Sequence, residues 1–196
     1  MPRQPRDMDF MHREAQAVLP ALLRAIGVTR PILIGHSDGA SIALIYAGSF
    51  GTGALRKALS TAPPLSVAVI APHLFVETIT VDAIARFTEA FEAGGWADRL
   101  GRHHRQPIET FRSWSGAWLA AAFRSWNIEA EVAAIECPVL AIQGENDQYG
   151  TALQVDRIAA LCPRARTLML PACRHSPHLD QPETVLAELS AFVACN

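Results

Sequence analysis

One serine, two carboxylates and two histidines stand in this sequence where they could carry out acyl-transfer chemistry. Ser37 lies within Gly35-His-Ser-Asp-Gly39, which has the pattern G-x-S-x-G. Between a strand and a helix, this pattern is typical of a sharp, strained turn that exposes the serine oxygen above a sheet. A serine hydroxyl is a weak nucleophile at neutral pH, so it needs a base, and the base needs an orienting carboxylate.

Two later loops supply candidates for that base and that carboxylate. One loop carries Glu145 and Asp147, and the other carries His175 and His178. Each loop follows an apolar run that is typical of a buried strand. Because the carboxyl ends of parallel strands meet at one edge of a sheet, we expect both loops to lie near Ser37. The chain order serine, acid, histidine is the one expected for a serine turn of this kind in an α/β sheet.

The residues beside Ser37 predict the strand and the helix that the turn needs. Residues 31–34 form a short apolar run, and residues 39–47 form a helix of small residues. We expect Gly35 and Gly39 to be required sterically, because a side chain at either position would collide with the neighbouring strand or helix.

Strands and helices alternate along much of the chain. Apolar runs predict buried strands at 67–71, 139–143 and 167–170. A helix that begins near residue 151 and ends at Pro163 separates the last two. This alternation predicts an α/β fold with a parallel sheet and right-handed crossovers.

Two terminal helices are expected to cover this sheet. The first spans residues 11–26, ends at Gly27 and has apolar residues at helical spacing: Ala15, Val18, Leu19, Leu22, Leu23 and Ile26. The last opens at Asp180-Gln-Pro-Glu183, an acidic cap with proline in the first turn. We expect it to bury Val185, Leu186, Leu189, Phe192 and Val193.

Residues 73–134 do not follow the alternation, since they show helical patterns and no strand signal. All four tryptophans of the chain lie here. We interpret the segment as a helical cap insertion over the sheet edge, which divides the chain into 1–72 (core), 73–134 (cap) and 135–196 (core). Most large aromatics pack within a protein, but a few that face inward would form an apolar substrate pocket. The pocket candidates are His36, Trp114 and Trp118.

Composition narrows the class of protein. The chain has 196 residues, a net charge of −2 and 50% hydrophobic residues. This favours a globular protein with a small-molecule substrate, and it disfavours a nucleic-acid surface, which needs a clustered basic excess. No apolar run approaches the roughly 20 residues of a membrane span, and the N-terminus lacks the apolar stretch of a signal peptide. The scattered cysteines favour reduced thiols and a cytoplasmic location.

Three motifs together carry a family resemblance. GHSDGASIAL, CPVLAIQGENDQYGT and HSPHLDQPE, in this order around a helical cap, resemble the α/β-hydrolase superfamily, and most of all its small bacterial esterases and C–C-bond hydrolases. The resemblance covers nearly the whole chain from about residue 9. It implies that Ser37 is the nucleophile, Asp147 the triad acid and His175 the base, with no metal and no organic cofactor.

The family pattern also ranks the local alternatives. Members usually place the acid three residues after the glycine that ends the strand, which favours Asp147 over Glu145. Their histidine loop is commonly Gly-His-Ser-Pro, which favours His175 and leaves His178 to brace the loop. Arg174 stands where the family prefers glycine, so we expect it to strain or redirect this loop. A metal pair of the two histidines is disfavoured, because no carboxylate or cysteine completes a ligand set.

The resemblance implies an acyl-enzyme mechanism. His175 takes the proton of Ser37, which attacks a carbonyl carbon, and the backbone N–H of Asp38 holds the oxyanion at a helix N-terminus. Hydrolysis of a small hydrophobic carboxylic ester is the leading prediction. C–C-bond hydrolysis and a non-catalytic binding role on a remnant of this fold are the alternatives, since one fold serves several functions.

The sequence before Ser37 departs from the family pattern. One helix, one strand and a Pro/Arg-rich tail precede it, whereas family members have further strands and an oxyanion loop. We therefore expect an N-terminally truncated sheet, from a start assigned too far downstream or from a fragment of a longer enzyme. A missing second oxyanion donor would lower the rate by about 10²–10³. The strand at 32–34 would have an unpaired apolar edge, which a homodimer could pair.

Overall fold

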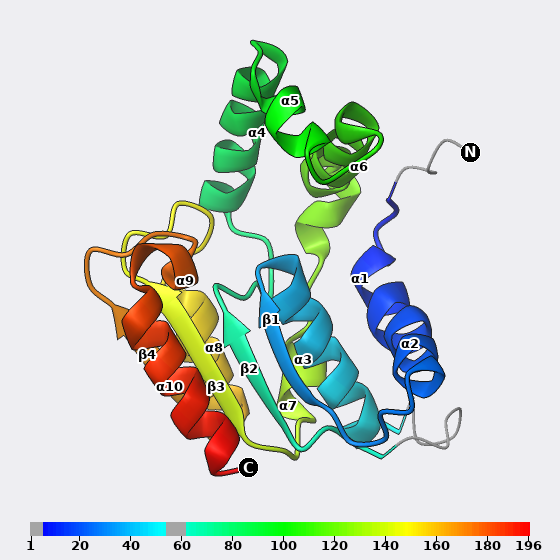
Figure 1. The fold of residues 1–196 in the computed structure, drawn as a ribbon, viewed down its shortest axis with the longest axis vertical. Helices are drawn as coiled ribbons and strands as arrows, with labels where there is room; N and C mark the ends of the chain where they lie inside the picture. Colours follow the sequence, from blue (N-terminus) through cyan, green and yellow to red (C-terminus); the bar gives the residue numbers. More distant parts are fainter. Residues whose placement is uncertain (1–5, 54–61) are drawn as a thin grey trace.

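Four parallel strands form one sheet in the computed structural model, which describes residues 6–53 and 62–196 (Figure 1). The first five residues of the Pro/Arg-rich tail lie outside the described residues. The strands follow one another in the sheet in chain order: β1 (Ile32–His36), β2 (Ser66–Ile70), β3 (Val139–Gly144) and β4 (Ala165–Leu170). The predicted α/β fold with a parallel sheet is confirmed.

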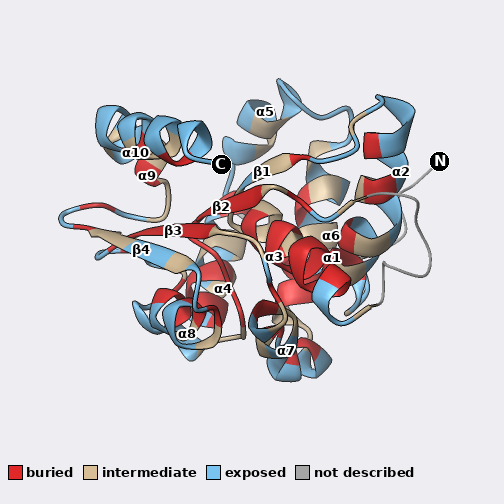
Figure 2. Cartoon of the chain, turned by 90° about the horizontal axis from the view of Figure 1, so that it is seen from below, coloured by how far each residue is buried: buried red, intermediate tan, exposed pale blue. Residues whose placement is uncertain are grey.

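The two central strands are buried on both faces, as their continuous apolar runs predict. Side chains of successive strand residues point to opposite faces. Val67 and Val69 of β2 therefore join one core cluster, while Ala68 and Ile70 join a second cluster on the other face. Figure 2 shows this buried centre between the exposed outer surfaces of the helices.

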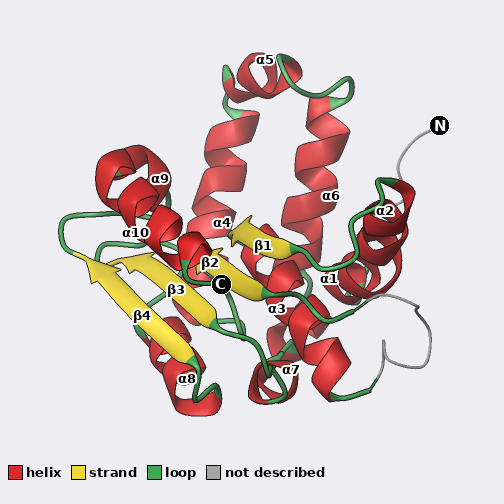
Figure 3. Cartoon of the chain, turned by 60° about the horizontal axis from the view of Figure 1, so that its bottom comes forward, coloured by secondary structure: helices red, strands yellow, loops and turns green. Residues whose placement is uncertain are grey.

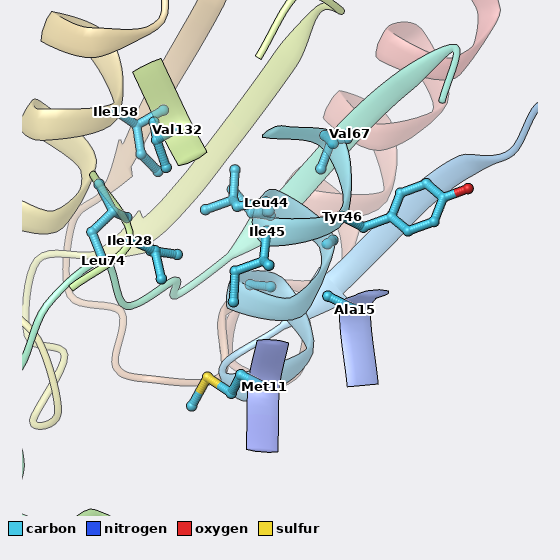
Figure 4. Packing of buried hydrophobic residues seen from close by; sticks show 14 of the residues in the cluster. Met11, Ala15, Leu44, Ile45, Tyr46, Val67, Leu74, Ile128, Val132 and Ile158 are labelled. Carbon is cyan, nitrogen blue, oxygen red and sulfur yellow. The ribbon is translucent and has the colours of Figure 1, made fainter. Parts of the chain in front are cut away.

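The larger cluster is built around α3 (Asp38–Gly51), whose small residues allow close packing on β1 and β2. Figure 4 shows Leu44 and Ile45 of α3 within this cluster, with Met11 near one end and Val132 near the other. The helices that contribute to it include α1 (Phe10–Arg13), α7 (Glu129–Ala133) and α8 (Leu153–Leu161).

The N-terminal helix is not the uniform helix that the spacing predicts. A π-helix, η1 (Glu14–Val18), separates α1 from α2 (Leu19–Ala25). A π turn holds more residues than an α turn, so it rotates the helical face that follows. Val18, Leu22 and Ile26 are consequently exposed by 48%, 53% and 61%, whereas Ala15 and Leu23 are buried as predicted.

The last helix begins later than its acidic motif predicts. α10 spans Pro182–Ala194, and its N-cap is Gln181 rather than Asp180. Asp180 instead ends the short helix α9 (Pro177–Asp180). Its carboxylate accepts a hydrogen bond of 2.8 Å from the backbone N–H of Arg174, so it stabilises the preceding loop instead of capping α10.

The apolar face of α10 is only partly covered. Val185 and Phe192 pack on the second core cluster, but Leu186 and Val193 are 66% and 38% exposed, so their predicted burial is wrong. On β1, Ile34 is 54% exposed although it lies in a strand. β1 is an edge strand that pairs only with β2 among the described residues, and no described helix covers Ile34.

The segment between β2 and β3 is helical: α4 (Thr78–Glu92), α5 (Trp96–Gly101), α6 (Pro107–Leu119), the 3₁₀ helix η2 (Ala121–Ser125) and α7. Figures 1 and 3 show α4 and α6 side by side beyond the ends of the strands, with α5 joining them. Its aromatics mostly pack on one another, as in the stacked pair Phe91–Phe111 at 3.8 Å. Within the described part of the chain, no helix combines the length and apolarity needed to cross a bilayer.

Candidate active site

Ser37 occupies a strained turn between the end of β1 and the start of α3. Its φ and ψ are 55° and −123°, a conformation that side chains rarely adopt. Its backbone N–H donates a hydrogen bond of 2.9 Å to the carbonyl oxygen of Ile70, which ties the turn to the end of β2. The turn therefore has the sharp, strained geometry that the G-x-S-x-G pattern predicts.

The two glycines of this pattern differ in their surroundings. A Cβ atom on Gly35 would lie 2.3 Å from the carbonyl oxygen of Gly39, so the predicted steric requirement holds there. A Cβ atom on Gly39 would meet nothing within 4 Å, so the same prediction for Gly39 is wrong. The reason is that position 39 lies in the first turn of α3 and faces open space.

His175, in the loop after β4, contacts both Ser37 and Asp147. Its Nε2 lies 3.0 Å from the Oγ of Ser37, and its Nδ1 lies 2.9 Å from one carboxylate oxygen of Asp147 and 3.0 Å from the other. With the proton on Nδ1, the imidazole donates to the carboxylate and accepts from the serine hydroxyl. The structure thus brings together the three residues predicted as a triad, from three different strand ends.

Asp147 is held in place by groups on its own loop and strand. It is 6% exposed, and it accepts a hydrogen bond of 2.8 Å from the backbone N–H of Tyr149 and one of 3.3 Å from the side chain of Gln143. Glu145, its local alternative, is exposed, and no hydrogen bond joins it to His175 within the described ranges. The geometry therefore favours Asp147.

Within the described residues, no hydrogen bond joins the second histidine of the loop to Ser37. His178 belongs to α9, and its ring contacts that of His36 with centroids 4.7 Å apart. His36 in turn donates from Nε2 to the carbonyl oxygen of His175 at 2.8 Å. Burial lowers the pKa of His36, which favours the neutral form of its imidazole. Together these contacts support the loop that carries His175.

Arg174 does not strain this loop as its sequence position predicts. In the described residues, positive φ outside glycine occurs at Ser37, Ala71 and Ala172, and Arg174 is not among them. Glycine is required only where the backbone adopts such a conformation or where space is lacking. The arginine side chain is largely exposed, and His175 still reaches both of its partners.

A cavity of about 200 Å³ lies beside Ser37. The three predicted pocket residues, His36, Trp114 and Trp118, are among those that line it. Sequence reasoning missed four others: His73, Thr80, Ile84 and Tyr149. The sequence position of His73 could have indicated its place in the cavity. It follows the carboxyl end of β2, just as Asp147 follows that of β3 and His175 that of β4.

His73 is buried between the catalytic candidates and the helical segment. It is 2% exposed, and its ring centroid lies 5.9 Å from that of His175 and 5.1 Å from that of Trp118. Burial lowers the pKa of His73 to about 3, so its imidazole is neutral at physiological pH. It therefore contributes shape and dipoles to the cavity but no charge.

Asp38 presents two different groups at the start of α3. Its backbone N–H belongs to the first turn, where amide groups have no partner within the helix. Its carboxylate accepts a hydrogen bond of 3.2 Å from the indole of Trp118 and lies 3.6 Å from the guanidinium of Arg6. Burial raises the pKa of Asp38 to about 6, although Arg6 and the indoles of Trp118 and Trp114 favour the ionised form.

Residues 6–53 and 62–196 contain no group of three or more histidine, cysteine, aspartate or glutamate side chains arranged to hold a metal ion. The described residues therefore add no third ligand to the pair His175 and His178.

Comparisons with known proteins identify the family of this chain. The profile of the Alpha/beta hydrolase family matches residues 2–189. Over 69 residues, 35% of this chain and 25% of the other, the sequence is 36% identical to the pimeloyl-[acyl-carrier protein] methyl ester esterase of Nitrosomonas europaea.

Solved structures show the same fold. A bacterial membrane phospholipase A has a TM-score of 0.67 at 22% identity, with 99% of this chain and 65% of that chain covered. A thermophilic esterase from Thermogutta terrifontis has a TM-score of 0.64 at 17% identity, with 99% and 74% covered. The chain thus spans about two thirds of the phospholipase and a quarter of the curated relative.

Proposed function

The chain belongs to the alpha/beta hydrolase family, and from this membership we propose that it is a serine hydrolase that cleaves a small carboxylic ester. The observation that carries the proposal is the hydrogen-bonded series Ser37, His175 and Asp147 at the carboxyl edge of the sheet. A nucleophile, a base in hydrogen-bond reach and a carboxylate that orients the base are what acyl transfer requires.

In the proposed reaction, His175 accepts the proton of Ser37 as the serine oxygen attacks the ester carbonyl carbon. The imidazolium then donates that proton to the leaving alcohol, and the acyl group stays on the serine. Water, deprotonated by the same imidazole, cleaves the acyl-enzyme and restores the hydroxyl. Asp147 holds the proton-bearing Nδ1 toward itself and offsets the positive charge of the ring.

The oxyanion of the tetrahedral intermediate is assigned to the backbone N–H of Asp38. This amide follows the nucleophile and starts α3, a helix of 14 residues whose dipole favours negative charge at its N-terminus. An amide aimed at the developing charge stabilises the transition state more than the ground state.

The cavity suits a short acyl or alkyl group. Ile84 from α4 and Trp114 and Trp118 from α6 supply apolar surface, which supports a role of the helical segment 73–134 as a cap over the site. The curated relative is named for a methyl ester, and the two structural neighbours are named as an esterase and a phospholipase. We therefore place ester hydrolysis ahead of C–C-bond hydrolysis, which would use the same three residues.

Labelling with a fluorophosphonate, followed by intact mass and peptide mapping, tests the proposal. We expect one adduct, on Ser37, and none in the Ser37→Ala variant. The adduct requires both the nucleophile and the base, so it reports their assembly without a known substrate. A folded chain that takes up no label would contradict the proposal and favour a non-catalytic binding role.

A further inference from the structure

The cavity beside Ser37 is lined by an acidic side chain, that of Asp38, and by no lysine or arginine among the described residues. The nearby histidines do not compensate, because burial lowers the pKa of both His36 and His73. Asp147 and His175 face each other in a hydrogen-bonded pair, so they add no free positive charge.

The carboxylate of Asp38 is fixed in place. Its side chain is 20% exposed, the indole of Trp118 donates to one oxygen, and the guanidinium of Arg6 lies near the other. Arg6 is itself tied to α6, because its backbone N–H donates to the hydroxyl of Ser113 at 3.0 Å. Although burial raises the pKa of Asp38 to about 6, the group is ionised in mildly alkaline buffer.

We propose that Asp38 is a specificity-determining residue that makes this cavity accept neutral acyl groups and reject acyl groups that carry a carboxylate. The inference rests on the proposed function, since it places the acyl group of the ester in the cavity beside Ser37. A second carboxylate there would meet the charge of Asp38 with little water to screen it, and no lining cation would pair with it.

Arg6 moderates this selection without lining the cavity. Its positive charge lies 3.6 Å from the carboxylate of Asp38 and partly offsets the field of that group. Removal of the Asp38 charge and removal of the Arg6 charge should therefore change selectivity in opposite directions. Opposite changes in the two variants would indicate an effect of charge, because a general loss of packing would not change selectivity in opposite directions.

The test compares two esters of equal chain length, p-nitrophenyl hexanoate and mono-p-nitrophenyl adipate, at about pH 8, where Asp38 is ionised. For the wild type we expect kcat/KM for the neutral ester to exceed that for the anionic ester at least about tenfold. Asp38→Asn keeps the size and an acceptor for Trp118, and it should reduce this ratio to about threefold or less. Arg6→Gln should increase the ratio.

Several results would overturn the inference. They are a wild-type preference for the adipate ester and an unchanged ratio in Asp38→Asn. If circular dichroism shows that Asp38→Asn does not fold, an unchanged ratio of the two kcat/KM values in Arg6→Gln would overturn the inference instead.

A binding measurement separates this inference from the proposed function. If the wild type cleaves neither ester, the proposed function fails. NMR titration of the wild type and of Asp38→Asn with hexanamide and with adipamate then decides the inference alone. A preference for hexanamide that the variant loses supports it, and equal binding of the two amides by the wild type overturns it.

Discussion

The Nε2 of His175 lies 3.0 Å from the Oγ of Ser37, although the two residues follow opposite edge strands of the sheet, β4 and β1. The histidine loop must therefore return across the end of β3. Gly144, the last residue of β3, makes this passage possible, because a Cβ atom there would lie 2.2 Å from the carbonyl oxygen of Cys173 and 2.4 Å from that of Arg174.

Gly144→Ala should displace this loop and separate His175 from Ser37. We expect a loss of activity of about 10²-fold or more, since a small misplacement of a catalytic group has such effects. The measurement is the rate of fluorophosphonate labelling, with folding checked by circular dichroism. Wild-type labelling in a folded Gly144→Ala variant would show that the loop can pass β3 without the glycine.

Asp147→Asn should preserve the fold but remove the carboxylate that orients His175. We expect kcat to fall by about 10³–10⁴-fold, because the imidazole loses its preferred tautomer and the offset of its charge. Glu145→Gln is the matched control, since Glu145 is an exposed carboxylate on the same loop and should keep near-normal kcat. The reverse ranking of the two variants would assign the acid to Glu145.

Gly35→Ala and Gly39→Ala form a matched pair within the serine turn. The first should unfold or strongly destabilise the chain, because its Cβ would lie 2.3 Å from a backbone carbonyl oxygen. The second should be neutral or stabilising by up to about 1 kcal/mol, as alanine is favoured over glycine in a helix. Urea denaturation curves measure both. Equal destabilisation by the two would contradict the geometry of this turn.

The stability of the chain should respond to pH through Asp38. The ordinary pKa of an aspartate carboxyl is 3.8, and burial in the fold raises the pKa of Asp38 to about 6. Between these values the unfolded chain loses the proton and the folded chain keeps it, so the free energy of unfolding falls as pH rises. Relative to Asp38→Asn, the wild type should lose on the order of 2–3 kcal/mol across this window.

Urea titrations of both proteins at several pH values within this window measure that difference. Subtracting the free energy of unfolding of the variant from that of the wild type cancels the contributions of the titrating groups that the two chains share. A difference that does not change with pH would show that Asp38 titrates normally. A wild type that gains stability relative to the variant as pH rises would reverse the sign and indicate a dominant pairing with Arg6.

The edge of β1 that no strand among residues 6–53 and 62–196 pairs is a proposed site of self-association. Ile34 on this strand is 54% exposed, and unpaired apolar strand edges favour edge-to-edge pairing. We expect concentration-dependent association of the wild type in sedimentation velocity, and weaker association of Ile34→Lys. Leu153→Lys, which changes an exposed apolar residue of α8, is the control. Equal association of all three proteins would place the contact elsewhere.

Much of the fold could be predicted because its signals are local. The apolar runs of β2 and β3 identify strands buried on both faces, since such strands have no polar side. The pattern around Ser37 identifies the turn, because only a narrow set of residues tolerates that backbone. The loops that carry Asp147 and His175 follow from the rule that parallel strands end at a common edge.

Other features depend on contacts between distant segments, which no local pattern contains. Leu22 and Leu186 both have the helical spacing of buried residues, yet both are exposed. The reason is that η1 rotates the helix that carries Leu22, and that α10 covers only part of the second face of the sheet. Gly39 resembles Gly35 in sequence, but only the three-dimensional path of α3 shows which of the two is confined.

The sequence by itself determined the α/β fold, the succession of strands and helices along the chain and the three candidate residue types at the strand ends, because hydrophobic periodicity and turn chemistry act over a few residues. Only the tertiary structure decided what surrounds them. Arg6, Asp38 and Trp118 are brought together from the N-terminal segment, the serine turn and α6. Burial at that junction raises the pKa of Asp38 to about 6, an effect that the residue type alone does not predict.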